Sequence, residues 1–220
     1  MVFLFCAYRE WSIKLYEKLS KKHNNFVLLN SPKKLTFSFV KKLNPEFIFF
    51  PDWSWIIPEK ITSNYKCVCF HESNLPKFRG GSPLQNQIIR GITKTKTTAF
   101  FMSKGIDEGD IILQRDLSLN GSIDEIFLRM IENDFKIIEK IILGNYKLTK
   151  QKGRRSVFKR RKPDESELDS LPHSLEYFYN FIRMLDDPYP NAFIRLGNKK
   201  IILKNPQYKN GKITFNGEII

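Results

Sequence analysis

Short apolar stretches alternate with amphipathic segments through the first half of the chain, and this alternation limits the folds open to it. The stretches 2–8, 25–30 and 46–51 are almost continuously apolar and rich in aromatic and β-branched residues, which is typical of strands buried on both faces. Apolar residues between them recur at helical spacing, at Trp11, Leu15 and Leu19 and at Leu35, Phe39, Val40 and Leu43. The repeat predicts an α/β fold with a Rossmann-like, doubly wound, mainly parallel sheet.

The middle of the chain continues with strand and helix patterns. "KCVCFH" (66–71) is typical of a fourth strand, and 95–103 and 105–117 are two further extended segments, the second opening on an acidic turn. Ser122 and Glu125 have the spacing of a capping box and predict the start of a long amphipathic helix.

The stretch 149–166 differs in composition from the rest. It holds six Lys or Arg between positions 152 and 161, few apolar residues and a proline, so we expect an exposed connection there. A helix near 173–186 and strands at "KKIILK" and "KITF" follow. We therefore divide the chain into a first domain, residues 1–150, and a small α+β C-terminal region, residues 151–220, that packs on it.

Composition and charge narrow the function classes. The 220 residues, 41% of them apolar, can bury one substantial core, and the formal charge of +14 would attract a polyanion or a phosphorylated small molecule. No run of about 18 uncharged apolar residues and no basic leader are present, so we expect a cytoplasmic protein without a membrane span. Cys6, Cys67 and Cys69 lack a second Cys/His cluster, so we expect reduced thiols and no metal.

A histidine and an acidic turn are the candidates for chemistry. His71 ends the predicted fourth strand, at the edge where α/β sheets place their ligands. No glycine follows the first strand closely, which disfavours NAD or FAD. A turn carrying Asp107, Glu108 and Asp110 lies about 36 residues later, and a histidine with such a carboxylate can form the acid/base pair of acyl or formyl transfer. Each feature alone also fits a packed histidine and a solvated turn.

The loop after His71 ends in a predicted helix start. Gly80 and Gly81 precede Ser82, which we expect to cap the helix, with Pro83 at its first position and Gln85 three residues past the cap. The loop should therefore be fixed at both ends.

These segments resemble a known family. "HESNLPKFRGGSPLQNQIIRG" is similar to the His-Pro-Ser-Leu-Leu-Pro, Arg-Gly and Pro-Ile segment of the formyltransferases that use 10-formyltetrahydrofolate, and "GIDEGDIILQ" resembles their Leu-Asp-Thr-Gly-Asp-Ile segment. "DWSWIIP" resembles the loop that lines the folate's pteridine ring. "IRMLDDPYPNAFIRLGNKK" resembles the C-terminal part of the methionyl-tRNA and amino-sugar members. The resemblance implies the formyltransferase fold, with catalysis in residues 1–150 and acceptor binding in residues 151–220.

The resemblance also assigns roles by position. His71 and Asp107 match the catalytic pair, and the folate contacts would be Trp53, Ser54, Trp55, Ile56, Ile57, Asp107 and Asp110. The acceptor contacts would be Arg79, Gly80, Gly81, Ser82, Pro83, Arg160, Arg161 and Lys162. For the basic residues 160–162, an exposed linker is an equal alternative.

Cys69 departs from the family, which has an asparagine there to hold the formyl oxygen. A thiol is a weak donor, and a lost oxyanion donor costs about 3 to 4 kcal/mol in an acyl-transfer site. Either activity is low, or Asn74, Ser73 or a backbone N–H replaces the amide. A catalytically degenerate folate-binding relative remains an alternative.

The mechanism that the resemblance implies is direct. A neutral amine attacks the formyl carbon on N10 of the folate, protonated His71 stabilises the developing oxyanion, and Asp107 holds the imidazole and moves a proton, directly or through water. No metal and no covalent enzyme intermediate are required.

The resemblance does not by itself identify the acceptor of the formyl group. We favour a nucleotide-linked 4-amino-4,6-dideoxy sugar from surface-glycan synthesis over methionyl-tRNA, because the tRNA enzymes carry a further C-terminal β-barrel domain and this sequence ends at Ile220. Glycinamide ribonucleotide is a less favoured acceptor, and a non-enzymatic nucleic-acid binder is least favoured because no stacking motif is found. A homodimer stays open.

Overall fold

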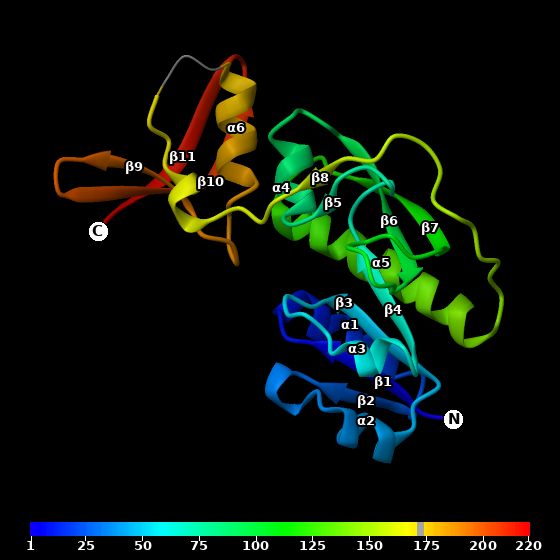
Figure 1. Ribbon diagram of the computed structural model, residues 1–220. Helices are drawn as coiled ribbons and strands as arrows, with labels where there is room; N and C mark the ends of the chain where they lie inside the picture. The colour runs from blue at the N-terminus through cyan, green and yellow to red at the C-terminus, as the bar shows by residue number, and fades with distance from the viewer. Residues whose placement is uncertain (171–173) are drawn as a thin grey trace.

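The computed structural model describes residues 1–170 and 174–220 and is built on a central six-stranded sheet (Figure 1). Its strands are Phe3–Ala7 (β1), Phe26–Leu29 (β2), Phe47–Asp52 (β3), Lys66–His71 (β4), Lys94–Phe101 (β6) and Ile111–Ser118 (β7). The order is β2-β1-β3-β4-β6-β7. The first four pair in parallel, and β6 and β7 are antiparallel additions at one edge. The predicted α/β fold with a mainly parallel, doubly wound sheet is confirmed.

Successive residues of the central strands enter two different cores. Phe5 and Phe49 lie in the larger core with helices α1 (Glu10–Ser20) and α5 (Ile123–Ile142), whereas Leu4 and Ile48 lie in a smaller core with α2 (Phe37–Leu43) and α3 (Glu59–Thr62). Side chains alternate between the faces of a strand, so a strand covered on both faces must be apolar throughout. This is why the predicted strands read as continuous apolar runs.

Two helix starts were predicted, and one of them forms differently. At α5 the Ser122 Oγ accepts a hydrogen bond from the Glu125 N–H at 3.2 Å, and the Ser122 N–H donates to the Glu125 carboxylate at 2.8 Å, as a capping box requires. At α4 (Pro83–Ile88), Pro83 does take the first position, but Ser82 has left-handed dihedrals and its side chain does not cap the helix. The Ser82 hydroxyl instead accepts the N–H of Arg161 at 3.1 Å.

The predicted connection 149–166 is mostly exposed but is held in place. Within it, Val157–Phe158 (β8) pairs in parallel with Arg79–Gly80 (β5), so the basic stretch runs along the loop that follows His71. Short 3₁₀ turns complete the fold at Pro32–Lys34 and Pro163–Ser166. The connection therefore forms part of the site described below.

The C-terminal region forms a smaller lobe in Figure 1, with helix α6 (Leu175–Arg183) against an antiparallel sheet of β9 (Ala192–Leu196), β10 (Lys199–Lys209) and β11 (Lys212–Ile219). The predicted helix begins at His173, which lies outside the described residues. Buried Arg183 joins the lobe to the first domain by donating to the carbonyls of Leu119 and Gly121 at 2.7 and 2.9 Å. The division at residues 1–150 and 151–220 stays a prediction.

The helices were also compared with the requirements of a membrane span. Within residues 1–170 and 174–220, no helix combines the length and apolar character that crossing a bilayer requires.

Candidate active site

A cavity of about 820 Å³ opens at the carboxyl ends of the parallel strands. Arg9 follows β1, Asp52 ends β3 and His71 ends β4, and all three line the cavity. Tyr189 and Leu185 line it from the C-terminal lobe. The two parts of the chain thus enclose one space at the edge where α/β sheets bind ligands.

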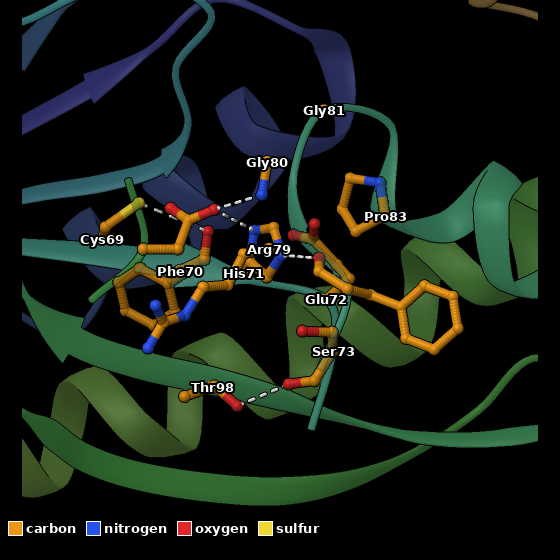
Figure 2. A network of polar contacts seen from close by, with 12 residues as sticks. Cys69, Phe70, His71, Glu72, Ser73, Arg79, Gly80, Gly81, Pro83 and Thr98 are labelled. Carbon is orange, nitrogen blue, oxygen red and sulfur yellow. Dashed lines mark hydrogen bonds and ion pairs between the residues drawn. The ribbon is translucent and has the colours of Figure 1, made fainter. Parts of the chain in front are cut away.

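The imidazole of His71 has a fixed orientation (Figure 2). Its Nε2 lies 2.6 Å from the carbonyl oxygen of Phe78, and its Nδ1 lies 3.6 Å from Oδ2 of Asp107. A carbonyl only accepts hydrogen bonds, so Nε2 carries a hydrogen. The ring is buried, and its charged form would face the Asp107 carboxylate at Nδ1. His71 and Asp107, far apart in sequence, are therefore brought together as a pair.

Asp107 is held at its side chain and at its backbone. The Gly80 N–H donates to its Oδ2 at 2.8 Å, and the Gln151 side-chain amide donates to its backbone carbonyl at 2.8 Å. Its φ of 51° places it in the left-handed region, which Asp adopts more readily than most residues. The carboxylate is thus aimed at the His71 ring by contacts that sequence reasoning did not identify.

Cys69 lines the cavity as a neutral thiol. Burial raises its pKa well above the ordinary thiol value, and the nearby Asp107 charge acts in the same direction. The Sγ lies 3.6 Å from the carbonyl of Phe70. The substitutes considered for the missing amide are engaged elsewhere, because the Ser73 hydroxyl donates to the carbonyl of Lys77 and the exposed Asn74 accepts from Gln114.

Residues 53–57, here called the aromatic loop, follow β3. Some of their side chains line the cavity and others do not. Trp53, Ser54 and Ile56 line it, whereas Trp55 and Ile57 do not. Trp55 packs edge-on against Trp53 and Tyr8, with ring centroids 5.0 and 4.6 Å apart. The indole N–H of Trp53 is buried and has no hydrogen-bond partner in the described parts of the chain.

Residues 156–162, here called the strap, run along the loop that carries Gly80 and Gly81. Phe158 accepts the Gly81 N–H at 2.8 Å, and its ring stacks on Phe78 with centroids 5.0 Å apart. Arg160 reaches across to donate to the Ser54 hydroxyl at 2.7 Å. The strap therefore links the Gly80–Gly81 turn to the aromatic loop, and Arg160, Arg161 and Lys162 all line the cavity.

A glycine is required where the strap crosses the loop. A Cβ on Gly81 would lie 2.3 Å from the Cα of Arg160. We expect Gly81→Ala to displace the strap, because overpacking by one methyl group typically costs 1 to 3 kcal/mol. Trypsin should cut the variant after residues 159–161 about tenfold faster than wild type. Gly217→Ala, where the nearest atom is 3.5 Å away, is the matched control, and equal cleavage of both variants would contradict the prediction.

Two further predicted site residues, Arg79 and Asp110, do not line the large cavity. The buried Arg79 guanidinium donates to Glu108 at 2.9 Å and to the Gln151 carbonyl oxygen at 2.7 Å. It lines a second cavity of about 370 Å³ together with Asp110. The sequence led us to expect an acceptor contact from Arg79 and a folate contact from Asp110, and the structure places both in the lining of the second cavity.

Sequence reasoning missed a polar cluster on the cavity wall, made of Arg9, Asp52, Glu72 and Tyr189. Arg9 forms an ion pair with Asp52 at 3.4 Å, and its guanidinium lies 5.1 Å from the Tyr189 ring centroid. Burial raises the pKa of Asp52 and raises that of Glu72 to about 8. Part of this cluster could have been recognised from sequence position, because Arg9 and Asp52 lie at the ends of predicted strands, as His71 does.

The described residues were also searched for metal ligands. No three His, Cys, Asp or Glu side chains in residues 1–170 and 174–220 gather closely enough to hold a metal ion. The three cysteines are unpaired.

Family models and curated relatives place this site among known proteins. Residues 22–130 match the model described as formyl transferase, and residues 163–220 match the model described as the C-terminal domain of methionyl-tRNA formyltransferase. The methionyl-tRNA formyltransferase of Thermotoga maritima is 30% identical over 179 residues, which cover 78% of this chain and 57% of the relative. The enzyme of that name from Campylobacter jejuni is 31% identical over 75% of this chain and 54% of its own length. The chain thus spans a little over half the length of these relatives.

Solved structures give the same grouping. A methionyl-tRNA formyltransferase from Clostridium thermocellum is 44% identical, has a TM-score of 0.96, and is matched over 100% of this chain and 99% of its own. A likely sugar N-formyltransferase from Mycobacterium tuberculosis is 18% identical, with a TM-score of 0.74 over 94% of this chain and 99% of its own. The second comparison shows a shared fold alone.

Proposed function

The chain belongs to the formyl transferase family, and from that membership we propose that it moves a formyl group from 10-formyltetrahydrofolate to the amino group of methionyl-tRNA. The observation that carries the proposal is the pair of buried His71 and half-buried Asp107, with Nδ1 and Oδ2 3.6 Å apart, on the wall of the large cavity. The match of residues 163–220 and the 44% identical structure of that name support the acceptor.

The expectation of a nucleotide-linked amino sugar, with tRNA as the less favoured partner, was wrong. It rested on chain length, because a tRNA enzyme was expected to need a further β-barrel domain after Ile220. Residues 163–220 instead match the C-terminal domain of methionyl-tRNA formyltransferases, and a structure of that name is covered almost completely by this chain. The sugar formyltransferases are similar at 16 to 18% identity.

The aromatic loop fits a pteridine ring. The buried, unpartnered Trp53 N–H is a donor that a ring nitrogen or oxygen would satisfy, and an unmet buried donor of this kind is unfavourable. Ile56, 97% exposed, and Ile106, 68% exposed, offer apolar surface at the rim of the same cavity. 10-Formyltetrahydrofolate supplies the activated formyl carbon when it is bound.

His71 is suited to the oxygen of that formyl group. With Nε2 held by the Phe78 carbonyl and Nδ1 facing Asp107, both ring hydrogens of the imidazolium have acceptors, and the positive charge lies inside a buried site. A fixed charge in such a site stabilises the negative charge that develops on the formyl oxygen more than it would in water.

Asp107 is suited to proton transfer and orientation. Its carboxylate is fixed by the Gly80 N–H and faces Nδ1 of His71. It can accept a proton from the attacking amine, directly or through one water molecule, and return it to the leaving nitrogen. Gln151 and Arg79 would act as positioning residues because they hold the loop and do not line the large cavity.

The strap is suited to an anionic acceptor. Arg160, Arg161 and Lys162 place three positive charges beside the reacting groups, and phosphate groups near a nucleic-acid terminus would be attracted to them. Neutralising these charges should weaken tRNA binding and reduce its dependence on salt.

The function is tested with the whole chain, 10-formyltetrahydrofolate and methionyl-tRNA, with the product released from the tRNA and identified by mass spectrometry. We expect formylmethionine to form, and none to form from uncharged tRNA mixed with free methionine. The function would be contradicted by tight folate binding with no formylation of methionyl-tRNA.

A further inference from the structure

Glu72 is the side chain in the cavity whose environment is least explained by the fold. It follows His71 directly, on the part of the loop that leads to Gly81 and Pro83 (Figure 2), and it lines the large cavity. Its backbone carbonyl accepts the Gln87 amide at 2.6 Å. Its carboxylate accepts a hydrogen bond from its own backbone N–H, but it forms no ion pair and no hydrogen bond with another residue in the described parts of the chain.

The charges around Glu72 are out of balance. Asp52 and Asp107 both oppose the ionisation of Glu72, and the Arg9 guanidinium favours it. The strap cations line the same cavity, and Arg160 acts on Asp52. Arg9 contacts Oδ1 of Asp52, and Arg160 and Trp11 also stabilise the charge of that carboxylate. Buried carboxylates are costly without a cation or donors. Glu72, when it ionises, is therefore the carboxylate on this wall that can pair with an additional positive charge.

The surroundings also indicate what carries that charge. Trp11, Leu84 and Met130 line the same cavity with apolar surface, and Leu185 adds to it from the C-terminal lobe. A ligand that joins a primary ammonium to an apolar side chain would fill this space. A methionyl ester has both groups.

We propose that Glu72 receives the amino group of the acceptor, holding the incoming ammonium beside His71 and taking from it the proton that must leave before the amine attacks. The proposal rests on the function proposed above and adds the residue that prepares the nucleophile. The high pKa of Glu72, caused mainly by burial and next by Asp52, suits it to exchange a proton with an amine near neutral pH.

The proton balance of the step is complete. The ammonium gives one proton to Glu72, and the neutral amine then forms the C–N bond to the formyl carbon. The bond from that carbon to N10 of the folate breaks, the amine loses its second proton, and N10 gains one through the His71 and Asp107 pair. The proton on Glu72 passes to solvent, so each turnover releases one proton.

Several other groups influence the charge on Glu72 and must be considered. Asp52 and Asp107 raise its pKa and Arg9 lowers it. Glu72 in turn raises the pKa of Asp134 on α5, of Cys69 and of Tyr189. His71 adjoins it in the chain.

A binding experiment tests the proposal without turnover. The probe is methioninamide, titrated calorimetrically into the whole protein at pH 7 in buffers of different ionisation enthalpy. At this pH a group with a pKa of about 8 is mostly protonated, so capture of an ammonium should release close to one proton. We expect this release in wild type and in Glu17→Gln, an exposed control, and its loss, with at least tenfold weaker binding, in Glu72→Gln. Equal proton release by Glu72→Gln and wild type would overturn the proposal.

A kinetic experiment tests the proton transfer itself. In Glu72→Gln the acceptor must arrive already neutral, so kcat/KM should fall about tenfold at pH 7 and recover to within about threefold of wild type at pH 9, above the ordinary α-amino pKa. Glu72→Asp should retain part of the activity and an acid limb in the pH profile. A loss that is the same at both pH values would mean a merely structural role.

The two proposals fail in distinguishable ways. If wild type binds methioninamide with proton release but does not formylate methionyl-tRNA, the ammonium site stands and the proposed function falls. If wild type formylates methionyl-tRNA and Glu72→Gln matches it at pH 7, the function stands and Glu72 does not act on the amine. If Glu72→Gln weakens the binding of tetrahydrofolate and leaves acceptor binding unchanged, Glu72 contacts the folate and the proposal is overturned.

Discussion

Replacing His71 by asparagine is expected to lower kcat/KM for formyl transfer at least about 100-fold, the usual contribution of a general acid or base. Asparagine is neutral and has no titratable proton, so it cannot replace the imidazolium that contacts the Phe78 carbonyl and Asp107. The stabilising charge near the formyl oxygen would therefore be lost. Single-turnover assays with saturating folate measure this effect without interference from product release.

The His71→Asn result is interpretable only if the site remains folded. Tetrahydrofolate should bind the variant within about threefold of wild type, which quenching of tryptophan fluorescence can report because Trp53 lines the cavity. Asp107→Asn should reduce turnover in the same direction. If both variants keep the rate within about threefold of wild type, the catalytic assignment is wrong.

Replacing Phe49 by alanine is expected to lower the free energy of unfolding by about 3 to 5 kcal/mol, the usual cost of a large cavity in a core. Phe49 is fully buried at the centre of β3, and its ring centroid lies 5.8 to 6.2 Å from those of Phe3, Phe26 and Phe47. No neighbouring side chain can fill the space because those rings are themselves fixed in the larger core. The loss is a large part of the 5 to 15 kcal/mol typical of a folded domain.

Urea unfolding, monitored by circular dichroism, measures the change in the free energy of unfolding caused by Phe49→Ala. The matched control is Phe215→Ala on β11, whose side chain is 46% exposed, and which should change the free energy by no more than about 0.5 kcal/mol. If the two substitutions are equally tolerated, the description of the larger core is incorrect.

The fold was predictable because its strongest signals are local. A strand covered by helices on both faces must be apolar at every position, so stretches 2–8 and 46–51 could be recognised without any tertiary information. The capping box of Ser122 and Glu125 is equally local and forms as expected. The helix cap predicted at Ser82 does not form, because its side chain accepts a hydrogen bond from Arg161, which is far away in sequence.

The candidate site was predictable in part. His71 could be placed from its position at a strand end, and Asp107 from its acidic turn and the family resemblance. The contacts of the Arg79 guanidinium with Glu108 and Gln151 could not be predicted, because they join residues far apart in sequence. The acceptor was misjudged for another reason, since a missing domain was inferred from length alone while residues 163–220 match the tRNA enzymes.

The sequence by itself determined the order of strands and helices, the alternation of the two cores and the strand end that presents His71, because hydrophobic periodicity and capping act over a few residues. Only the tertiary structure decided that Asp107 faces His71 and that the strap crosses the Gly80–Gly81 turn. It also decided that Glu72, near Arg9 and Asp52, has no ion-pair partner among the described residues. These features depend on contacts between residues tens of positions apart. Such contacts are fixed when the chain closes around the cavity, and no local pattern encodes them.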